Sequence, residues 1–316
     1  MLLEIQVKRN DANQRVDRYV RKLCPGLGLS RLHYLFRKKE IKIGLRPVAR
    51  SHVLEQGDRL RIFGLKDSEM GTAIHSGRPS HDKLAFGLPI IHEDEDLLVI
   101  NKPGHIPVHP GSRVPPGSSV IEKSLDYLGW RKAEVFKPSL IHRLDKETSG
   151  VLLLAKNSRA LRFWAKELKE RRIKKTYHAL VLGAPRSDKG CITENLTRIG
   201  SKRGGAKSIV KSGEGLYART FYQVDKRFED YSLLSITIET GRLHQIRAHL
   251  SHEGAPILGD TRYGDFRANR IARRKYALKR GFLHAASLQG KDMQGKSFFF
   301  RAELPDDLRE CLARIS

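Results

Sequence analysis

Asp145 is the residue with the clearest chemical potential, because it lies in a polar run from His142 to Gly150 that leads into an apolar segment. Arg143 and Lys146 flank its carboxyl group, and nearby positive charges favour the ionised form of an aspartate. An ionised carboxylate in a cleft can act as a nucleophile or as a general base. The same residues would also suit a surface ion pair, so the spacing alone leaves a structural role open.

A second carboxylate would indicate a different reaction. Ordinary glycoside hydrolases use two, one that protonates the leaving group and one that works on the sugar or on water. Glu147 is the candidate in this run, but it stands only two residues after Asp145. A nucleoside or glycoside hydrolase is therefore an alternative that this spacing does not favour.

Metal and cofactor motifs are not complete in this sequence. His244, His249 and His252 are close together, but their spacing is not HExxH and no carboxylate partner is obvious, so we interpret them as RNA-facing or structural. No complete GxxxxGK[ST] phosphate loop occurs. The three cysteines are far apart and form no CxxC pair, which suits reduced thiols better than a zinc site or a disulfide frame; they are Cys24, Cys191 and Cys311. We expect no metal site.

The charge balance indicates a polyanionic partner. The chain has 60 Lys and Arg residues against 35 Asp and Glu residues, a formal net charge of +25, and such an excess opposes compact folding. Nucleic acid is the first candidate and an anionic membrane the second, because basic side chains that neutralise phosphates release counterions. No segment approaches the ~20 apolar residues of a membrane span, and the N-terminus does not resemble a secretory signal. We therefore expect a cytoplasmic protein that binds nucleic acid.

Residues 1–64 form a small basic module with 15 Lys and Arg and 6 Asp and Glu residues. An apolar face at helical spacing predicts a helix from Gln14 to Leu23. Ser30 is the expected N-cap of a second, strongly basic helix. Alternating segments then predict strands at Ile41–Ile43 and Arg59–Phe63. Two basic helices followed by a hairpin can place positive charge along RNA phosphates.

The rest of the chain divides into a linker and one larger domain. Residues 65–87 are rich in turn-forming residues and have no sustained periodicity, so they are the expected linker. Residues 88–316 alternate between strand and helix patterns. The strand candidates are Leu97–Ile100, Val151–Ala155, Tyr177–Leu182 and Leu233–Glu239, and the helix candidates are 159–171 and 243–252. Between Arg267 and Arg280, seven of 14 residues are basic and none is acidic; this segment is either an RNA-gripping insertion or a solvated helix or loop.

The run around Asp145 resembles the catalytic motif of the RluA-type pseudouridine synthases, HRLDxxTSG followed by an aliphatic strand. Further segments resemble that family in the expected order: Glu95–Gly104 with His109–Gly111, Lys175–Val181, Gly241–Leu250, Gly259–Asp265 and Leu283–Ala285. Three short segments of the basic module, Gln14–Asp17, Ser30–Arg31 and Gly57–Leu60, resemble the S4 RNA-binding domain. Together these likenesses cover nearly the whole chain, and its architecture is similar to that of bacterial large-subunit ribosomal RNA enzymes of the C and D types.

The resemblance implies a reaction and a fold. Such an enzyme converts uridine of structured RNA, here most simply 23S ribosomal RNA, to pseudouridine by cutting the N1–C1′ bond, rotating the base and rejoining it through C5. Nothing is oxidised and no group enters or leaves, so no cofactor is expected. The implied fold class is α+β, with a small S4-like module and a catalytic domain built on a mixed, largely antiparallel sheet flanked by helices and loops. We expect a monomer.

The resemblance also assigns roles to single residues. Asp145 either attacks C1′ or removes the C2′ proton to give a glycal, and both routes stay open. Tyr177 stacks on the extruded uracil or transfers a proton at C5, and Arg247 pairs with Asp145. Without the resemblance, Tyr177 would be an ordinary strand tyrosine and Arg247 a solvent-facing helix arginine.

The expected RNA-binding and substrate-binding residues are Arg143, which fills the space left by the flipped nucleotide, Lys102 in the cleft wall, Leu283 under the base, Arg242 at the basic helix start, and Arg31, Arg37 and Lys38 in the basic module. A non-catalytic RNA-binding or ribosome-assembly factor of the same fold would be the alternative, but it would be expected to carry a degraded catalytic run, and this one is intact.

Overall fold

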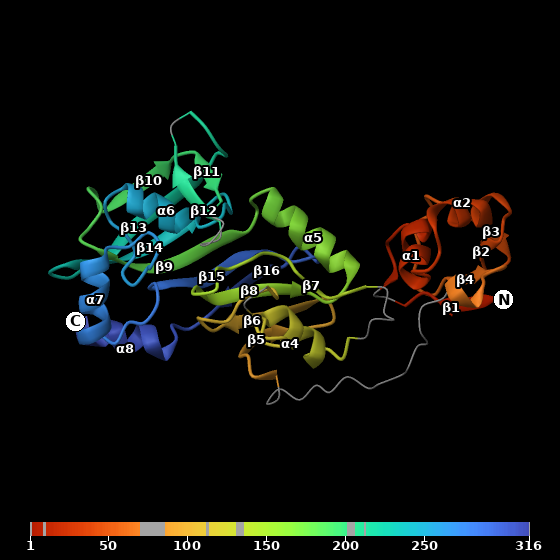
Figure 1. Cartoon of the computed structure of the whole chain (residues 1–316), viewed down its shortest axis with the longest axis horizontal. Coiled ribbons are helices and arrows are strands. Elements are labelled where there is room, and N and C mark those ends of the chain that lie inside the picture. The colour runs from red at the N-terminus through yellow and green to blue at the C-terminus, as the bar shows by residue number, and fades with distance from the viewer. Residues whose placement is uncertain are drawn as a thin grey trace.

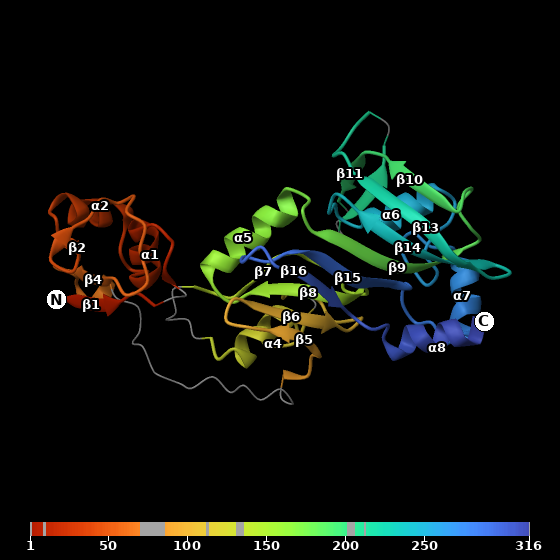
Figure 2. The ribbon, with the colours of Figure 1, turned by 180° about the vertical axis from the view of Figure 1, so that it is seen from behind.

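The computed structural model describes residues 2–8, 11–69, 86–111, 114–130, 136–200, 206–211 and 213–315, so most of the predicted linker lies outside the described residues. A small N-terminal module stands at one end of the long axis, and a larger body built on an extended sheet occupies the rest (Figure 1). The view from behind shows the C-terminal helix at the opposite end from this module (Figure 2).

The N-terminal module packs two helices on a four-stranded sheet. Its helices are α1 (Val16–Leu23) and α2 (Leu29–Arg37), and its strands are β1 (Leu3–Gln6), β2 (Ile41–Ile43), β3 (Arg46–Pro47) and β4 (Arg59–Ile62), in the order β1-β4-β2-β3. The buried face of α1 carries Val16, Tyr19 and Val20, as the apolar spacing predicts. The predicted N-cap was wrong: α2 begins at Leu29, and Gly28 in extended conformation precedes it.

The packing of this module continues beyond residue 64. Leu65 belongs to its apolar core, and a short 3-10 helix, η2 (Asp67–Glu69), follows. The carboxylate of Glu69 accepts a hydrogen bond from Arg31 Nε at 3.2 Å and another from the backbone of Lys66 at 2.8 Å. The first residues of the predicted linker therefore fold against the module.

The larger body is built on a ten-stranded sheet. The main path runs β10-β13-β14-β9-β15-β8-β6-β5, with β16 beside β15 and β7 beside β8. Every recorded strand pair of this sheet is antiparallel except β8 with β15. The predicted fold class, α+β with a mixed and largely antiparallel sheet, is confirmed. The strands are β5 (Ile90–Glu93), β6 (Leu97–Lys102), β7 (Ser139–Leu140), β8 (Ser149–Ala155), β9 (Lys174–Leu182), β10 (Lys189–Thr193), β13 (Arg219–Arg227), β14 (Tyr231–Ile238), β15 (Leu283–Lys291) and β16 (Ser297–Arg301), and a separate hairpin joins β11 (Leu196–Ile199) to β12 (Lys207–Val210).

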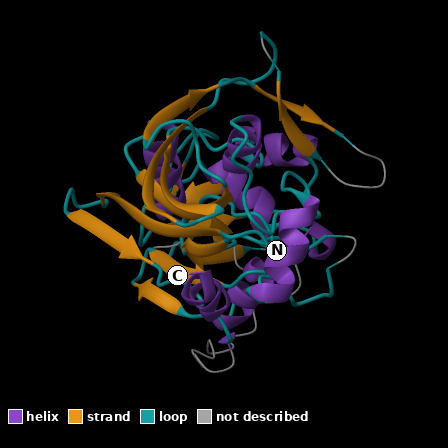
Figure 3. Cartoon of the chain, turned by 90° about the vertical axis from the view of Figure 1, so that its left-hand side faces the viewer, coloured by secondary structure: helices purple, strands orange, loops and turns teal. Residues whose placement is uncertain are grey.

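Helices pack beside the sheet, and several strands run out to the edge of the molecule in this view (Figure 3). They are α4 (Val120–Tyr127), α5 (Ser158–Lys169), α6 (Gln245–His252), α7 (Phe266–Lys275) and α8 (Asp306–Ile315). Most of the basic segment 267–280 is helix α7, whose Ala268 and Ala272 pack into an apolar core; RNA binding by this segment stays a prediction. In the part of the chain that the structure describes, no helix is long and apolar enough to cross a membrane.

Gly150 allows the parallel pair at the centre of the sheet to form. This residue has a φ of +117° and pairs with Lys102 on β6 and with Ala285 on β15. A Cβ atom at this position would lie 2.1 Å from the carbonyl oxygen of Ala285. Only glycine fits both the conformation and the space, and β8 can therefore begin beside β15, directly after the run that carries Asp145.

Candidate active site

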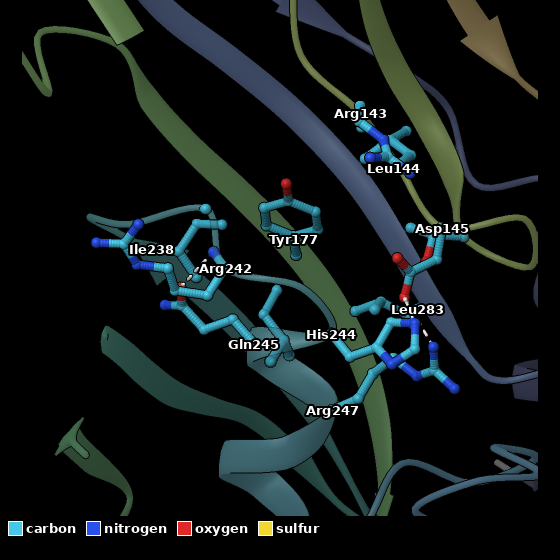
Figure 4. Close-up of a pocket in the computed structure, with 13 residues that line it drawn as sticks. Arg143, Leu144, Asp145, Tyr177, Ile238, Arg242, His244, Gln245, Arg247 and Leu283 are labelled. Carbon is cyan, nitrogen blue, oxygen red and sulfur yellow. Dashed lines mark hydrogen bonds and ion pairs between the residues drawn. The ribbon is translucent and has the colours of Figure 1, made fainter. Parts of the chain in front are cut away.

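Four separate parts of the chain meet at one open pocket of about 450 Å³ (Figure 4). Asp145 comes from the loop between β7 and β8, Tyr177 from β9, Arg247 from α6, and Leu283 from the start of β15. The remaining lining residues are Arg143, Leu144, Thr148, Ile238, Gly241, Arg242, His244, Gln245 and Ile246.

Arg247 holds the carboxylate of Asp145. Its Nη1 donates to Asp145 Oδ2 at 2.8 Å, while its Nε and Nη2 donate to the two oxygens of Asp260 at 2.6 and 2.9 Å. The guanidinium group is thus fixed in its plane by a bidentate pair, the geometry in which arginine binds carboxylates most specifically. The side chain of Asp145 is 26% exposed and that of Asp260 only 3%, so Asp145 is the carboxylate that a ligand can reach.

Asp260 is the buried anchor of this arrangement. Its Oδ1 also accepts the backbone N–H groups of Arg262 and Tyr263 at 2.8 and 3.1 Å. Burial acts to raise the pKa of Asp260, but the hydrogen bonds and charge of Arg247 outweigh burial and lower it. Burial likewise opposes the charge of Arg247, yet Asp260 first and Asp145 second raise the pKa of the guanidinium group. Asp260 and Arg247 therefore remain ionised together.

His244 lies beside the same carboxylate. It precedes α6 with a φ of +52°, an uncommon conformation for a residue with a side chain. Its Nε2 lies 3.7 Å from Asp145 Oδ2, and its Nδ1 is 3.1 Å from the hydroxyl of Tyr263. The ring of Tyr263 in turn lies 5.0 Å from the guanidinium carbon of Arg247. Burial is the largest of the effects that lower the pKa of His244, so the imidazole is neutral near pH 7.

Tyr177 stands in the middle of the pocket, with its hydroxyl directed toward the side of Arg143 (Figure 4). Its backbone pairs with Ile236 on β14 and with Ala285 on β15, which fixes the position of the ring. Burial, and then the negative charge of Asp145, raise the pKa of the phenol. The hydroxyl is therefore protonated at neutral pH and can donate a hydrogen bond, but it is a poor base.

Lys102 does not lie on the RNA-accessible wall, contrary to the prediction. Its side chain is fully buried, and Nζ donates to the carbonyl oxygens of Pro103, Ile106 and Lys146 at 2.7, 2.8 and 2.9 Å. Burial, with a smaller contribution from Arg280, lowers the pKa of Lys102 to about 7. Because Lys146 follows Asp145 in the chain, this contact helps to hold the loop between β7 and β8 that carries Asp145, the catalytic loop.

Arg280 holds the other end of the same loop. Its Nη1 donates to the carbonyl oxygen of Glu147 at 2.8 Å, and its Nη2 donates to the Ser149 hydroxyl at 3.1 Å. Two further hydrogen bonds join it to the carboxylate of Asp307 on α8 at 2.7 and 3.1 Å. Arg280 is only 2% exposed, so this member of the predicted RNA-gripping segment is structural, whereas the other six basic residues of that segment are exposed.

Three other predicted substrate-binding residues do line the pocket. Arg143 and Arg242 are exposed at its rim, and Arg242 Nε donates to the carbonyl oxygen of Tyr217 at 3.1 Å. Leu283 is 6% exposed and forms part of the apolar wall. Their contact with RNA remains a prediction, but all three are in position for it.

The predicted RNA-binding residues of the N-terminal module lie along α2 and its C-terminal end. Arg37 and Lys38 are exposed, and Tyr34, which is also exposed, stands between the guanidinium groups of Arg31 and Arg37 at 5.1 and 5.9 Å. Arg31 differs from the other two because it donates to Glu69 and to the carbonyl oxygen of Gly64. It serves the packing of the module at least in part.

His249, unlike His244 of the same histidine cluster, lies outside the catalytic arrangement, and so does the side chain of Glu147. His249 is fully buried and bonds the hydroxyl of Thr220 and the carbonyl oxygen of Glu194, so it is structural. Glu147 pairs with His105 at 2.5 Å and lines a neighbouring cavity. Within the described residues, no group of side chains is arranged to hold a metal ion, and Asp145 is the one carboxylate that lines the pocket.

The segment Gly259–Asp265 is part of the family resemblance, but the sequence assigned no role to Asp260 or Tyr263. It also missed Asp307, whose pairing with Arg280 links α8 to the catalytic loop. The available signal was Asp260, which stands between a glycine and a threonine in that segment. Its position behind Arg247 depends on the turn that joins α6 to α7, which spacing does not reveal.

Comparison with known proteins places this geometry in a family. A family model described as RNA pseudouridylate synthase matches residues 96–252. The ribosomal large subunit pseudouridine synthase C of Escherichia coli strain K12 is 34% identical over 315 residues, which span 98% of this chain and 96% of that protein. The chain belongs to the RNA pseudouridylate synthase family. The enzyme of the same name from Buchnera aphidicola is 34% identical over 285 residues, 90% of this chain and 88% of that protein.

Solved structures agree with this assignment. The human RNA pseudouridylate synthase domain containing 4 protein is 28% identical, with a TM-score of 0.60 over 74% of this chain and 96% of that one. The domain containing 1 protein, 22% identical with a TM-score of 0.57, shares the fold. The prediction of an RluA-type pseudouridine synthase is confirmed: the protein is an isomerase that converts uridine in RNA to pseudouridine.

Proposed function

We propose that this pseudouridine synthase isomerises specific uridines of large-subunit ribosomal RNA, with Asp145 as the group that acts on the sugar. The observation that carries the proposal is the carboxylate of Asp145, held 2.8 Å from Arg247 at an open pocket. Relatives similar over 98% of the chain bear the name of ribosomal large-subunit enzymes, which supports this RNA as the substrate.

The chemistry requires one negative group at the sugar. The N1–C1′ bond breaks, the uracil rotates, C5 bonds to C1′, and the C5 proton moves to N1. Asp145 either adds to C1′ and is later displaced, or takes the C2′ proton and later returns it. Both routes balance without an oxidant, a reductant or a second substrate, so we propose that no cofactor takes part.

On either route the reacting C1′ must be kept from water. The surroundings of Asp145 suit this need because they limit access of water to C1′. Leu144, Ile238, Ile246 and Leu283 contribute apolar wall to the pocket. A charge–charge contact is stronger in such partly desolvated surroundings than in water. Arg247, fixed by Asp260, orients the carboxylate without having to reorganise during the reaction.

Tyr177 is placed to hold the extruded base. Its ring borders the pocket beside Leu283, and aromatic rings bind flipped bases by stacking. Its hydroxyl, kept protonated by burial and by Asp145, can donate a hydrogen bond to the uracil. A hydrolase would instead need a second carboxylate facing the sugar, and Glu147 is engaged with His105 at another cavity.

The N-terminal module is proposed to serve as an S4-like RNA-binding domain, predicted at residues 1–64 and extended by the packing of residues 65–69, and the rest of the predicted linker 65–87 is proposed to join it to the catalytic domain in 88–316. Exposed Arg37 and Lys38 beside the partly exposed ring of Tyr34 give α2 the mixture of charge and aromatic surface that nucleic acids bind. The expected cytoplasmic location and monomeric state stay predictions.

The replacement Asp145→Asn tests the proposal. Pseudouridine in an unmodified large-subunit ribosomal RNA transcript, measured by mass spectrometry after digestion, should fall at least ~1,000-fold, because the amide is neither a nucleophile nor a base. RNA affinity should change less than about twofold.

Two companion variants sharpen the result. Glu147→Gln is the matched control and should retain near wild-type turnover; loss of activity there with activity kept in Asp145→Asn would reverse the assignment. Tyr177→Phe keeps the ring and removes the hydroxyl, so unchanged turnover would limit Tyr177 to stacking.

A further inference from the structure

Three cavities follow one another along one side of the catalytic domain and share their walls. The catalytic pocket and a second cavity of about 650 Å³ have Thr148, Arg247 and Leu283 in common. The second cavity and a third of about 900 Å³ share Gly259, Thr261 and Lys279. The concave surface therefore extends from Asp145 past Arg247 to α7.

We call the surface formed by these three cavities the track. At its far end the track is lined by an arginine-bearing face of helix α7. Arg267, Arg270 and Arg273 all line the third cavity, and a spacing of three residues places their side chains along one side of a helix. All three are exposed, and within the described chain no ion pair engages them. Uncompensated arginines on a concave surface focus positive potential there, so an anionic ligand is favoured.

Phe266 adds an aromatic surface at the start of the same helix. It is 84% exposed and lines the third cavity with the arginines. The opposite face of α7 is fixed, because Ala268 and Ala272 pack with Leu278 in an apolar core, and Asp265 Oδ1 caps the helix by accepting from the backbone of Ala268 at 2.7 Å. An exposed ring among cationic side chains, on a helix whose other face is packed, is an arrangement on which single-stranded bases can stack.

We propose that the RNA strand adjoining the target nucleotide leaves the catalytic pocket along this track, with its phosphates on the arginine face of α7 and one unstacked base on Phe266. This inference rests on the proposed function and deepens it, because it assigns the site a length of single-stranded RNA rather than one nucleotide. Continuity with the pocket of Asp145 and the charge of α7 select RNA over a protein partner.

The test uses the full-length protein and an unmodified large-subunit ribosomal RNA transcript. The variant Arg267→Gln/Arg270→Gln/Arg273→Gln is compared with Lys291→Gln/Lys296→Gln/Arg314→Gln, which removes the same charge from exposed positions that line none of the three cavities. The α7 variant should bind about tenfold more weakly and reduce the slope of log affinity against log salt by about 2, the value for three lost phosphate contacts on single-stranded RNA. The single-turnover rate at saturating RNA should stay within about twofold of wild type.

A second pair of variants tests the stacking contact. Phe266→Ala should weaken binding at least about fivefold, whereas Phe299→Ala, at a ring 60% exposed on β16, should not. Unchanged affinity and salt slope in the α7 variant would overturn the inference, as would an equal loss in its charge-matched control. A change of oligomeric state in the RNA-free α7 variant would also overturn it, because that surface would then serve self-association. Failure of the proposed function is seen separately, as a wild-type protein that forms no pseudouridine in this RNA.

Discussion

The same residue type serves opposite purposes in two regions of the catalytic domain. Arg247 and Arg280 lie inside, each bidentate with an aspartate and each bonded to the loop that carries Asp145 or to Asp145 itself. The arginines of α7 lie outside on one exposed helix face. The net charge of +25 therefore includes two groups of cations with different roles. The internal cations fix the geometry of the active site, and the external cations provide affinity for RNA.

Internal and external arginines should differ in the property that a substitution changes. Removing an internal arginine or its aspartate should alter turnover or stability with little dependence on salt, because the contacts are shielded from solvent. Removing an external one should alter affinity and its salt dependence while turnover at saturating RNA persists.

Among the residues that position Asp145 or provide RNA affinity, the largest effect is expected at Asp260. Asp260→Asn breaks the bidentate pair with Arg247 and lets the guanidinium group turn away from Asp145, and a misplacement of about 1 Å costs ~100-fold in rate. Single-turnover kinetics should show this loss in the rate at saturating RNA, with affinity unchanged. Asp306→Asn, the same change at an exposed ion pair with Arg309, is the control. A rate within twofold of wild type would mean that Asp260 does not position Arg247.

Arg280→Gln should act on stability as well as on rate. The change removes the partner of Asp307 and leaves the Glu147 carbonyl oxygen without this donor, so the free energy of unfolding should fall by ~2–3 kcal/mol. Asp307→Asn should cost less, because that carboxylate is 46% exposed and can be hydrated. Denaturant unfolding followed by fluorescence measures both. Equal losses in the two variants would show that the ion pair, not the contact with the loop, carries the stability.

A fall in pH should destabilise the folded protein at His284, a buried histidine that is neutral in the folded state. Burial lowers the pKa of His284 from 6.5 to about 4, and the ring lies between the Ser149 hydroxyl and the Ala302 carbonyl oxygen at 2.9 and 3.0 Å. Between pH 6.5 and 4 the unfolded chain binds a proton that the folded His284 does not, so stability falls as the pH falls, by up to ~3 kcal/mol. Above pH 6.5 this contribution is constant.

The histidine effect is measured as the unfolding free energy against pH. His284→Gln should flatten the curve between pH 6.5 and 4, whereas His52→Gln, at an exposed position, should leave it unchanged. An unaltered slope in His284→Gln would assign the acid sensitivity to other groups.

The smallest effect is expected at the N-terminal module. Arg37→Gln/Lys38→Gln should weaken RNA binding a few-fold and reduce the salt slope by about 1–2, without changing the rate at saturating RNA. Lys291→Gln/Lys296→Gln is the charge-matched control. If the rate at saturation falls instead, α2 takes part in orienting the target and the division between internal and external cations is too simple.

The sequence predicted the elements that have strong periodicity. Strand β14 has Leu234, Ile236 and Ile238 on its buried side, as the alternation indicates, and α1 buries the expected face. The start of α2 was missed because Ser30 is a favourable N-cap by type, but Gly28 supplies the extended turn one residue before the helix. Strand β1, only four residues long, was not recognised.

The site residues that belong to a sequence motif were predictable. The residues whose role depends on being buried in the folded chain were not. Asp145, Tyr177 and Arg247 converge as expected. Lys102 was expected to line the cleft, but it is fully buried and donates to the carbonyl oxygens of Pro103, Ile106 and Lys146, the last of them 44 positions away in the chain. Arg280 looked like its basic neighbours, and only the position of Asp307 distinguishes it.

The contacts that hold the catalytic loop span long stretches of the chain. Arg280 reaches Glu147 across 133 positions, and Ser149 meets His284 across 135. Contacts of such sequence separation form late, since the intervening segment must close first. A chain still emerging during synthesis presents Asp145 and many arginines before Arg280 exists, so it could adhere to nearby RNA but could not isomerise it. Catalytic competence therefore marks the completed fold.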